Sequence, residues 1–303
     1  AAIGEQKYET LLAAIKAAQE GETITLIRNV TMDYNARDAY ETQAQNVVIN
    51  GNGKVLTLNQ KNSDWASFGL ANNSKLVLNN MTIEKTGYGD TSGAWNTHAI
   101  IFSCPVEMSN VTVNNAVAVQ AGATLNNVTI NEANAYYGLW INGNGQEVTI
   151  NGGAINANKN GGRGIKIADE YIDAPAKVTL NVTGTKFNTA NKAAVLVSSE
   201  AGADITASNA NISNVAADPV NFAWVDDGWA THYGKVAVTG AVDEVLCRNR
   251  HFRTLAVEGH GTEMSVFHMG PKDLAMEQNV NAFLPADLNG QKFDSLGVDG
   301  GHG

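Results

Sequence analysis

The sequence predicts an all-β protein that is built as a solenoid, and three observations carry this prediction. Charged residues make up only 17% of the 303 residues, and Asn, Thr, Ser and Gly supply much of the remaining polarity, which is typical of strands joined by turns. Nearly the same eight residues recur as LVLNNMTI at 76–83, VEMSNVTV at 106–113 and ATLNNVTI at 123–130. Within each copy apolar and polar residues alternate, which is the periodicity of a strand.

Further copies of this motif flank the first three. They start near residues 47, 148, 178, 205 and 236, so that successive copies lie between 17 and 31 residues apart. Repeats of this length indicate an array in which each unit buries its apolar face against its neighbours. We therefore expect a solenoid of about eight coils.

The repeated Asn pair marks a corner in each coil. The alternation of apolar and polar residues breaks at Asn79-Asn80, and Asn tolerates the left-handed backbone conformation that a sharp bend needs. We expect Asn80, Asn110 and Asn127 to stack as a ladder of amides, with Gly152 at the same place in the next coil.

Each coil also contains a second apolar stretch after a loop of variable length. These stretches are HAIIFS at 98–103, NAVAVQ at 115–120, YGLWIN at 137–142, RGIKIA at 163–168, AAVLVS at 193–198 and VNFAWV at 220–225. Their third and fifth residues are apolar and are expected to face the core: Ile100 and Phe102, Val117 and Val119, Leu139 and Ile141, Ile165 and Ile167, Val195 and Val197, and Phe222 and Trp224.

The two ends of the repeat differ from its middle. Residues 8–21 carry a helical apolar stripe that ends at Gly21, and we expect this helix to cap the core, with a first strand at 22–32. The solenoid together with this cap helix is expected to span residues 1–240. Residues 241–303 are expected to form a non-repeat β segment with a hairpin whose turn lies at His260-Gly261. This segment is interpreted as a distal cap, an oligomerisation element or an anchor, and these alternatives stay open.

The repeat and the N-terminal segment IGEQKYETLLAAIKAAQEGETITLIRNVTM together resemble a known group of proteins. The chain is similar over residues 1–240 to right-handed parallel β-helix proteins of the pectin-lyase-like superfamily, and closest in texture to the β-helical domains of bacterial surface proteins and of phage tail and fibre proteins. The resemblance implies the fold. It implies no single activity, because this fold carries lyases, hydrolases, adhesins and tail proteins.

The β-helix lyases imply one set of candidate catalytic residues. They use clustered Asp residues for calcium and Arg or Lys as the base, which here points to Arg163 or Lys166 with Asp226 and Asp227 as acidic partners. No neighbouring coil supplies a row of acidic residues, and an Arg/Lys pair on a strand surface is the alternative. We favour a non-catalytic protein without a cofactor. If a metal ion does bind, the resemblance to the lyases implies calcium.

Candidate ligand-binding residues come from the alignment of the coils. Tyr137, Trp140, Arg163 and Lys166 occupy outward positions of adjacent coils and are expected to form an exposed aromatic–basic patch. The remaining candidates are Trp95 and His98, beneath a long loop, and Trp229 and Tyr233, beside the two Asp residues. The alternative is that loops fold over these side chains and bury them.

Charge narrows the choice of partner. The net charge of −10 argues against nucleic acid and anionic membranes, and no apolar run is long enough to span a bilayer. The two cysteines, Cys104 and Cys247, lie in no metal-binding spacing and are expected to be buried free thiols.

We therefore expect a surface-attachment or structural protein, either an adhesin-type module or a phage fibre or decoration component. It would bind a polysaccharide or surface glycan along one face, outside the cell, at the cell surface or on a virion. It is a candidate for a homotrimer or for docking to a larger assembly through 241–303. A polysaccharide lyase or glycoside hydrolase acting on acidic polysaccharide and a purely architectural spacer are the alternatives.

Overall fold

The structure is a computed structural model that describes the chain in sixteen segments. They are residues 1–34, 39–61, 67–87, 99–132, 137–142, 145–157, 163–167, 176–189, 193–198, 201–208, 211–213, 221–226, 234–239, 244–247, 254–257 and 265–268. Side chains are described in these segments as far as residue 188, except at 163, 176 and 177, and the later segments are described by their backbone alone.

A short helix and an antiparallel strand pair close the N-terminal end. Helix α1 (Leu11–Ala17) begins after Thr10, whose Oγ1 accepts a hydrogen bond of 3.1 Å from the backbone N–H of Ala13. Its Leu11, Ala14 and Ile15 are buried in the core, as the apolar stripe predicts. The helix is shorter than the predicted 8–21, because the backbone turns to a ψ of 133° at Ala18, before Gly21 is reached.

The first strands bracket this helix. Strand β1 (Ala2–Ile3) pairs antiparallel with β2 (Gln6–Lys7) and with β3 (Thr23–Thr25). The single strand predicted at 22–32 is instead two strands, β3 and β4 (Val30–Tyr34), which turn a corner between them. All other pairings among the described residues are parallel.

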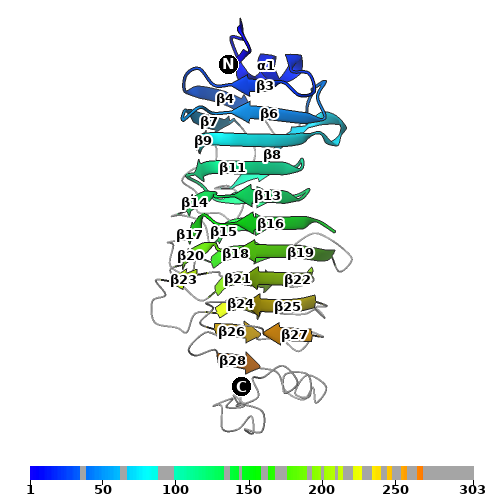
Figure 1. Ribbon diagram of the computed structural model, residues 1–303, viewed down its shortest axis with the longest axis vertical. Coiled ribbons are helices and arrows are strands. Elements are labelled where there is room, and N and C mark those ends of the chain that lie inside the picture. Colours follow the sequence, from blue (N-terminus) through cyan, green and yellow to red (C-terminus); the bar gives the residue numbers. More distant parts are fainter. Residues whose placement is uncertain are drawn as a thin grey trace.

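A large sheet runs the length of the molecule (Figure 1). After β1 to β4 it contains β6 (Asn46–Asn50), β7 (Val55–Gln60), β9 (Lys75–Gly87), β11 (Val106–Val113), β13 (Ala123–Asn126), β14 (Thr129–Glu132), β16 (Glu147–Asn151), β17 (Ala154–Ala157), β19 (Ala176–Thr183), β20 (Lys186–Thr189), β22 (Ala201–Ser208), β23 (Asn211–Ser213), β25 (Gly234–Thr239) and β27 (Thr254–Val257).

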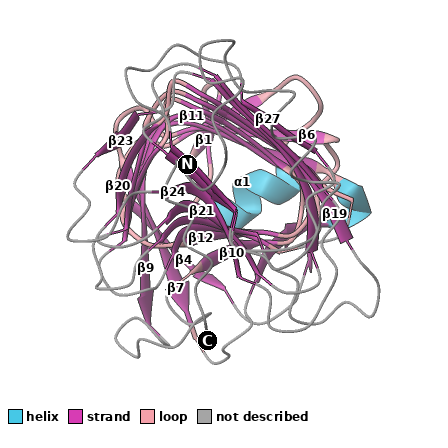
Figure 2. Cartoon of the chain, turned by 90° about the horizontal axis from the view of Figure 1, so that it is seen from below, coloured by secondary structure: helices cyan, strands magenta, loops and turns pink. Residues whose placement is uncertain are grey.

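A smaller parallel sheet faces it across the core. It contains β5 (Ala39–Tyr40), β8 (Ser67–Leu70), β10 (Ile100–Phe102), β12 (Val117–Val119), β15 (Tyr137–Ile141), β18 (Arg163–Ile167), β21 (Ala193–Ser198) and β24 (Asn221–Asp226), and a 3₁₀ turn, η1 (Ala71–Asn73), follows β8. Each passage of the chain through the large sheet and then the small one is called a rung below. Seen along the long axis, the rungs superpose into walls around a common interior, across which α1 lies (Figure 2).

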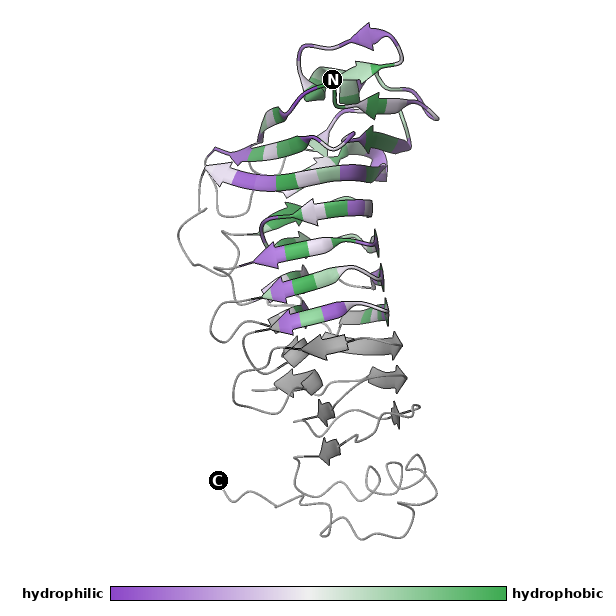
Figure 3. Ribbon diagram, turned by 60° about the vertical axis from the view of Figure 1, so that its left-hand side comes forward, coloured by the Kyte–Doolittle hydropathy of each residue, from purple (hydrophilic) through white to green (hydrophobic). Residues whose placement is uncertain are grey.

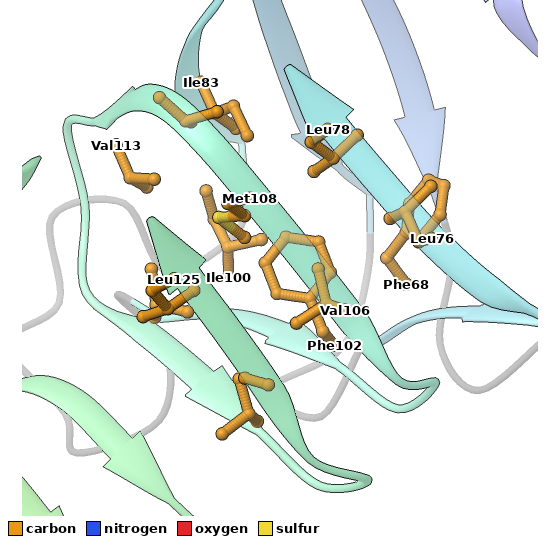
Figure 4. Close-up of a cluster of buried hydrophobic side chains, with 14 of the residues drawn as sticks. Phe68, Leu76, Leu78, Ile83, Ile100, Phe102, Val106, Met108, Val113 and Leu125 are labelled. Carbon is orange, nitrogen blue, oxygen red and sulfur yellow. The ribbon is translucent and has the colours of Figure 1, made fainter. Parts of the chain in front are cut away.

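Side chains at equal positions of successive rungs stack on one another in the core. Met108 of β11 pairs with Leu78 of β9 on one side and with Leu125 of β13 on the other, and all three are buried (Figure 4). The small sheet supplies the opposite side of this core through Ile100 and Phe102. The inward positions predicted for β10, β12, β15 and β18 are all confirmed.

The Asn corners are also confirmed. Asn80, Asn110 and Asn127 have positive φ values of 54°, 54° and 51°, and Gly152 has a φ of 65° in the following rung. The Nδ2 of Asn110 donates to Oδ1 of Asn80 at 3.4 Å, and the Nδ2 of Asn127 donates to Oδ1 of Asn110 at 2.8 Å. Each corner amide therefore supports the corner of the next rung.

Parallel pairing continues beyond residue 240. Strand β27 pairs with β25, and β26 (Glu244–Cys247) pairs with β28 (Ser265–His268). The predicted hairpin is wrong, because its two arms, β27 and β28, each add in parallel to an earlier strand. The role predicted for 241–303 as cap, oligomerisation element or anchor stays a prediction.

The register corrects one further expectation. Val195 pairs with Ala223 and Leu196 pairs with Trp224, so Phe222 and Trp224 do not continue the row of Val195 and Val197. Trp224 instead follows Leu196, which itself pairs with Lys166. A shift of one residue moves every position of a strand to the opposite side.

Candidate functional site

The register of the small sheet brings together the residues that the sequence predicts as a patch. Tyr137 pairs with Arg163, and Trp140 pairs with Lys166, on the adjacent strands β15 and β18. The rings of Tyr137 and Trp140 have centroids 5.5 Å apart and planes tilted by 58°. Lys166 Nζ lies 4.9 Å from the centroid of the Trp140 ring, within the range of a cation–π interaction. The predicted neighbours therefore do meet.

The expected exposure of the patch is wrong, and the alternative of burial holds for Tyr137, Trp140 and Lys166. The exposed fractions of Tyr137, Trp140 and Lys166 are only 0%, 1% and 3%. These residues belong to a second buried layer on the outward side of the small sheet, together with Ala99, Ile101, Ala116 and Ala118. The sequence held a signal for this layer, since the outward row continues through Ile101 and Ala118, and a strand that is apolar at successive positions is buried on both sides.

Burial limits what Lys166 can do chemically. Removing an ammonium group from water is costly, and the face of Trp140 compensates part of that cost. A buried ammonium against an indole ring does not meet a polymeric substrate. The position of Lys166 therefore gives no support to its proposed role as the base of a lyase, while for Arg163 only the backbone position is described.

The remaining predicted site residues are not tested by the geometry. Asp226 ends β24 and is described by its backbone only. Trp95, His98, Asp227, Trp229 and Tyr233 lie outside the described residues.

A buried polar corner was not predicted. Lys85 and Glu132 occupy inward positions at the ends of β9 and β14 and are only 5% and 3% exposed. Glu132 Oε2 accepts a hydrogen bond of 2.6 Å from the backbone N–H of Ala116, and Asn115 Oδ1 accepts one of 2.7 Å from the backbone N–H of Lys85. These bonds satisfy backbone groups where the chain leaves the large sheet for the small one. We therefore assign Lys85 and Glu132 a structural role.

The outward side of the large sheet is polar on strands β13, β16 and β19, and its rows follow the rungs. On β13, β16 and β19 one row consists of Thr124, Thr149 and Asn181, and the next consists of Asn126, Asn151 and Thr183. The Nδ2 of Asn151 donates to Oδ1 of Asn126 at 2.9 Å. All six side chains are partly or fully exposed. Bands of like hydropathy run across the stacked strands in Figure 3.

A second amide ladder follows the outward side of the strands beyond the Asn corners. The amides of Asn114, Asn131, Asn156 and Asn188 each donate to the side chain of the preceding rung, at distances between 2.6 and 3.3 Å. The first of them, Asn114, donates to the carboxylate of Glu84 at 3.3 Å. An amide has two N–H donors and two acceptor lone pairs, so a ladder occupies only half of them.

Other chemistry is sparse in the described part of the chain. No three His, Cys, Asp or Glu side chains there lie close enough together to hold a metal ion. No described helix has the length and apolar character that a membrane crossing requires. Cys104 is a buried free thiol, and this burial raises its pKa to about 11.

Comparison of the chain with protein-family models, with curated proteins and with solved structures finds no match.

Proposed function

We propose that the chain is a right-handed parallel β-helix and that it works as a non-catalytic surface-attachment or structural protein. In this proposal it is an adhesin-type module or a phage fibre or decoration component that acts outside the cell, at the cell surface or on a virion. Support comes from the parallel strands, which stack in register along one long body. Each rung therefore presents a side chain at the same place as the rung before it.

The observation that carries the proposal is the polar outward face of β13, β16 and β19 in the large sheet. Its Thr and Asn rows present hydroxyl and amide groups at regular intervals, and those groups are the hydrogen-bonding partners of sugar hydroxyls. On β10, β12 and β15 of the small sheet the outward side is covered, because Ile101, Ala118 and Trp140 are buried there. The glycan-binding face is therefore proposed on the large sheet and not at the patch predicted from the sequence.

Residues 241–303 are proposed to hold the protein in place, either by forming a homotrimer or by docking to a larger surface or virion assembly. This is supported by strand β27, which lies in this segment and pairs in parallel with β25 of the large sheet, so that the stack of strands continues past residue 240.

An architectural spacer is the second candidate function, and the amide ladders favour it. They link each rung to the next along the body and would stiffen a rod that binds nothing along its length.

A glycan array probed with the full chain tests the proposal, with light scattering to give the oligomeric state. Binding to one glycan class supports attachment. A silent array together with a stable oligomer would favour the spacer. Release of unsaturated products from an acidic polysaccharide would contradict the non-catalytic proposal.

A further inference from the structure

We infer that the glycan is an uncharged, extended polysaccharide and that it binds to a patch of six residues on β13, β16 and β19. This inference rests on the proposed function and names the class of ligand and the place where it binds. The Thr/Asn patch consists of Thr124, Asn126, Thr149, Asn151, Asn181 and Thr183.

The patch is a regular grid. Neighbouring parallel strands lie about 4.8 Å apart, and alternate residues of one strand lie about 6.6 Å apart on the same side. The register places Thr149 beside Thr124 and Asn181, and it places Asn151 beside Asn126 and Thr183. Three successive rungs therefore repeat almost the same pair of polar groups.

The groups of this grid are held in place before any ligand arrives. Thr is β-branched and restricted in its first side-chain torsion. The amides are fixed by their neighbours, since Asn126 Nδ2 donates to Ser109 Oγ at 3.5 Å, Asn151 Nδ2 to Asn126 Oδ1 at 2.9 Å, and Asn181 Nδ2 to Glu147 Oε1 at 3.5 Å. A pre-ordered surface loses little entropy when a ligand binds.

Charge argues for a neutral partner. None of the six side chains is charged. At the N-terminal border of the patch, Lys75 Nζ and Glu107 Oε2 pair with each other at 2.9 Å. Glu147 lies beside the patch, and the whole chain carries a net charge of −10. An acidic polysaccharide would be repelled by these carboxylates, whereas an uncharged one meets the hydroxyl and amide groups of the patch without that repulsion.

The repetition argues for a long ligand. One sugar unit can contact one rung with few hydrogen bonds, and each such contact is weak because water competes for the same groups. A chain whose units repeat along the rod engages several rungs at once, so that binding to the second and third rungs becomes intramolecular. We therefore expect strong binding to long or solid polysaccharide and weak binding to short oligosaccharides.

The test uses the full chain in pull-down experiments with insoluble cellulose and insoluble chitin. A soluble cello-oligosaccharide and the acidic polymer pectin serve as competitors. Thr149→Lys places a long charged side chain at the centre of the patch. Thr112→Lys is the matched control, because Thr112 is also an outward, partly exposed strand residue but lies beyond the Asn110 corner.

The expected result is retention on cellulose or chitin that falls about tenfold or more in Thr149→Lys and is unchanged in Thr112→Lys, since a central substitution disrupts an interface more than a peripheral one. Circular dichroism and thermal unfolding establish that both variants are folded. Equal retention of the two variants, or displacement by pectin at low concentration, would overturn the inference while leaving glycan binding elsewhere on the protein intact. No retention on either solid, together with a silent glycan array, would overturn the proposed function as well.

Discussion

The ammonium group of Lys166 lies 4.9 Å from the centre of the Trp140 ring, and both side chains are almost completely buried. Tyr137 packs against the same indole. Trp140 is thus the centre of the layer on the outward side of the small sheet, where it fills volume and faces a buried charge.

Replacing Trp140 with Ala should lower the free energy of unfolding by about 3–5 kcal/mol, because a large buried side chain is lost and a cavity remains. Trp140→Phe should cost clearly less, since a smaller aromatic face stays available to Lys166. Urea denaturation of the two variants and the wild type measures both effects. A loss below about 1 kcal/mol for Trp140→Ala would mean that the second buried layer does not stabilise the fold.

The amide ladder of the large sheet offers a second test. Asn131 Nδ2 donates to Asn114 at 3.0 Å, and Asn131 Oδ1 accepts a hydrogen bond from Asn156 at 2.7 Å. Asn131→Ala removes both bonds and should destabilise the protein by about 1–2 kcal/mol, the net value of one or two hydrogen bonds. Thr149→Ala, at an outward position without a hydrogen bond to a ladder amide among those described, should change stability by no more than about 0.5 kcal/mol. Equal losses in the two variants would show that the ladder adds nothing.

The stacking of the rungs could be predicted from the sequence because it depends on local patterns that repeat. Leu78, Met108 and Leu125 hold the same place in three copies of one motif, and strand periodicity alone assigns them to one side. The Asn corners were predictable for a similar reason, since few residues other than Gly and Asn adopt a positive φ readily.

The burial of Trp140 could not be derived from its own strand. Alternation tells which side of a strand a residue occupies, whereas what covers that side depends on segments remote in the sequence. The apolar row of Ile101 and Ala118 was the only local hint. For the candidate site this difference decided the outcome, because the sequence left both exposure and burial open for the outward residues and only the fold shows that they are buried.

Two other errors have the same physical origin. In NFAWV the residues from Phe222 to Val225 are all apolar, so the pattern favours neither of the two possible phases and the register had to come from pairing with β21. Strands β27 and β28 follow one another around a Gly-containing turn signal, yet each pairs in parallel with an earlier strand. The local sequence of a strand does not determine which other strand it pairs with.

Substitutions at the Asn110 corner separate two contributions to stability, the strain of the backbone and the hydrogen bonds of the amide ladder. Asn110 has a φ of 54°, a left-handed conformation that costs an ordinary L-residue about 1–2 kcal/mol and costs Gly almost nothing. Asn110→Ala and Asn110→Gly both lose the hydrogen bond from Asn127, so they differ chiefly in backbone strain. We expect the Ala variant to be less stable than the Gly variant by about 1 kcal/mol, as measured by thermal or urea unfolding. Equal stability would mean that the corner relaxes out of the left-handed region.

The buried thiol of Cys104 makes the free energy of unfolding depend on pH in the alkaline range. Burial of the side chain, which favours the neutral thiol, raises its pKa from the ordinary 9.0 to about 11. Above the ordinary value the unfolded chain loses this proton while the folded chain keeps it, so the free energy of unfolding should fall as the pH rises from about 9 to about 11. Two pKa units correspond to about 2–3 kcal/mol.

Cys104→Ala removes this ionisation and should weaken the pH dependence by that amount, whatever it does to stability at neutral pH. The measurement is urea denaturation of the variant and the wild type at about pH 8 and about pH 11. Parallel losses in the two proteins would contradict the assignment, because other groups would then account for the whole effect. The same burial predicts that a thiol reagent modifies Cys104 only after unfolding, since the thiolate is the reactive form.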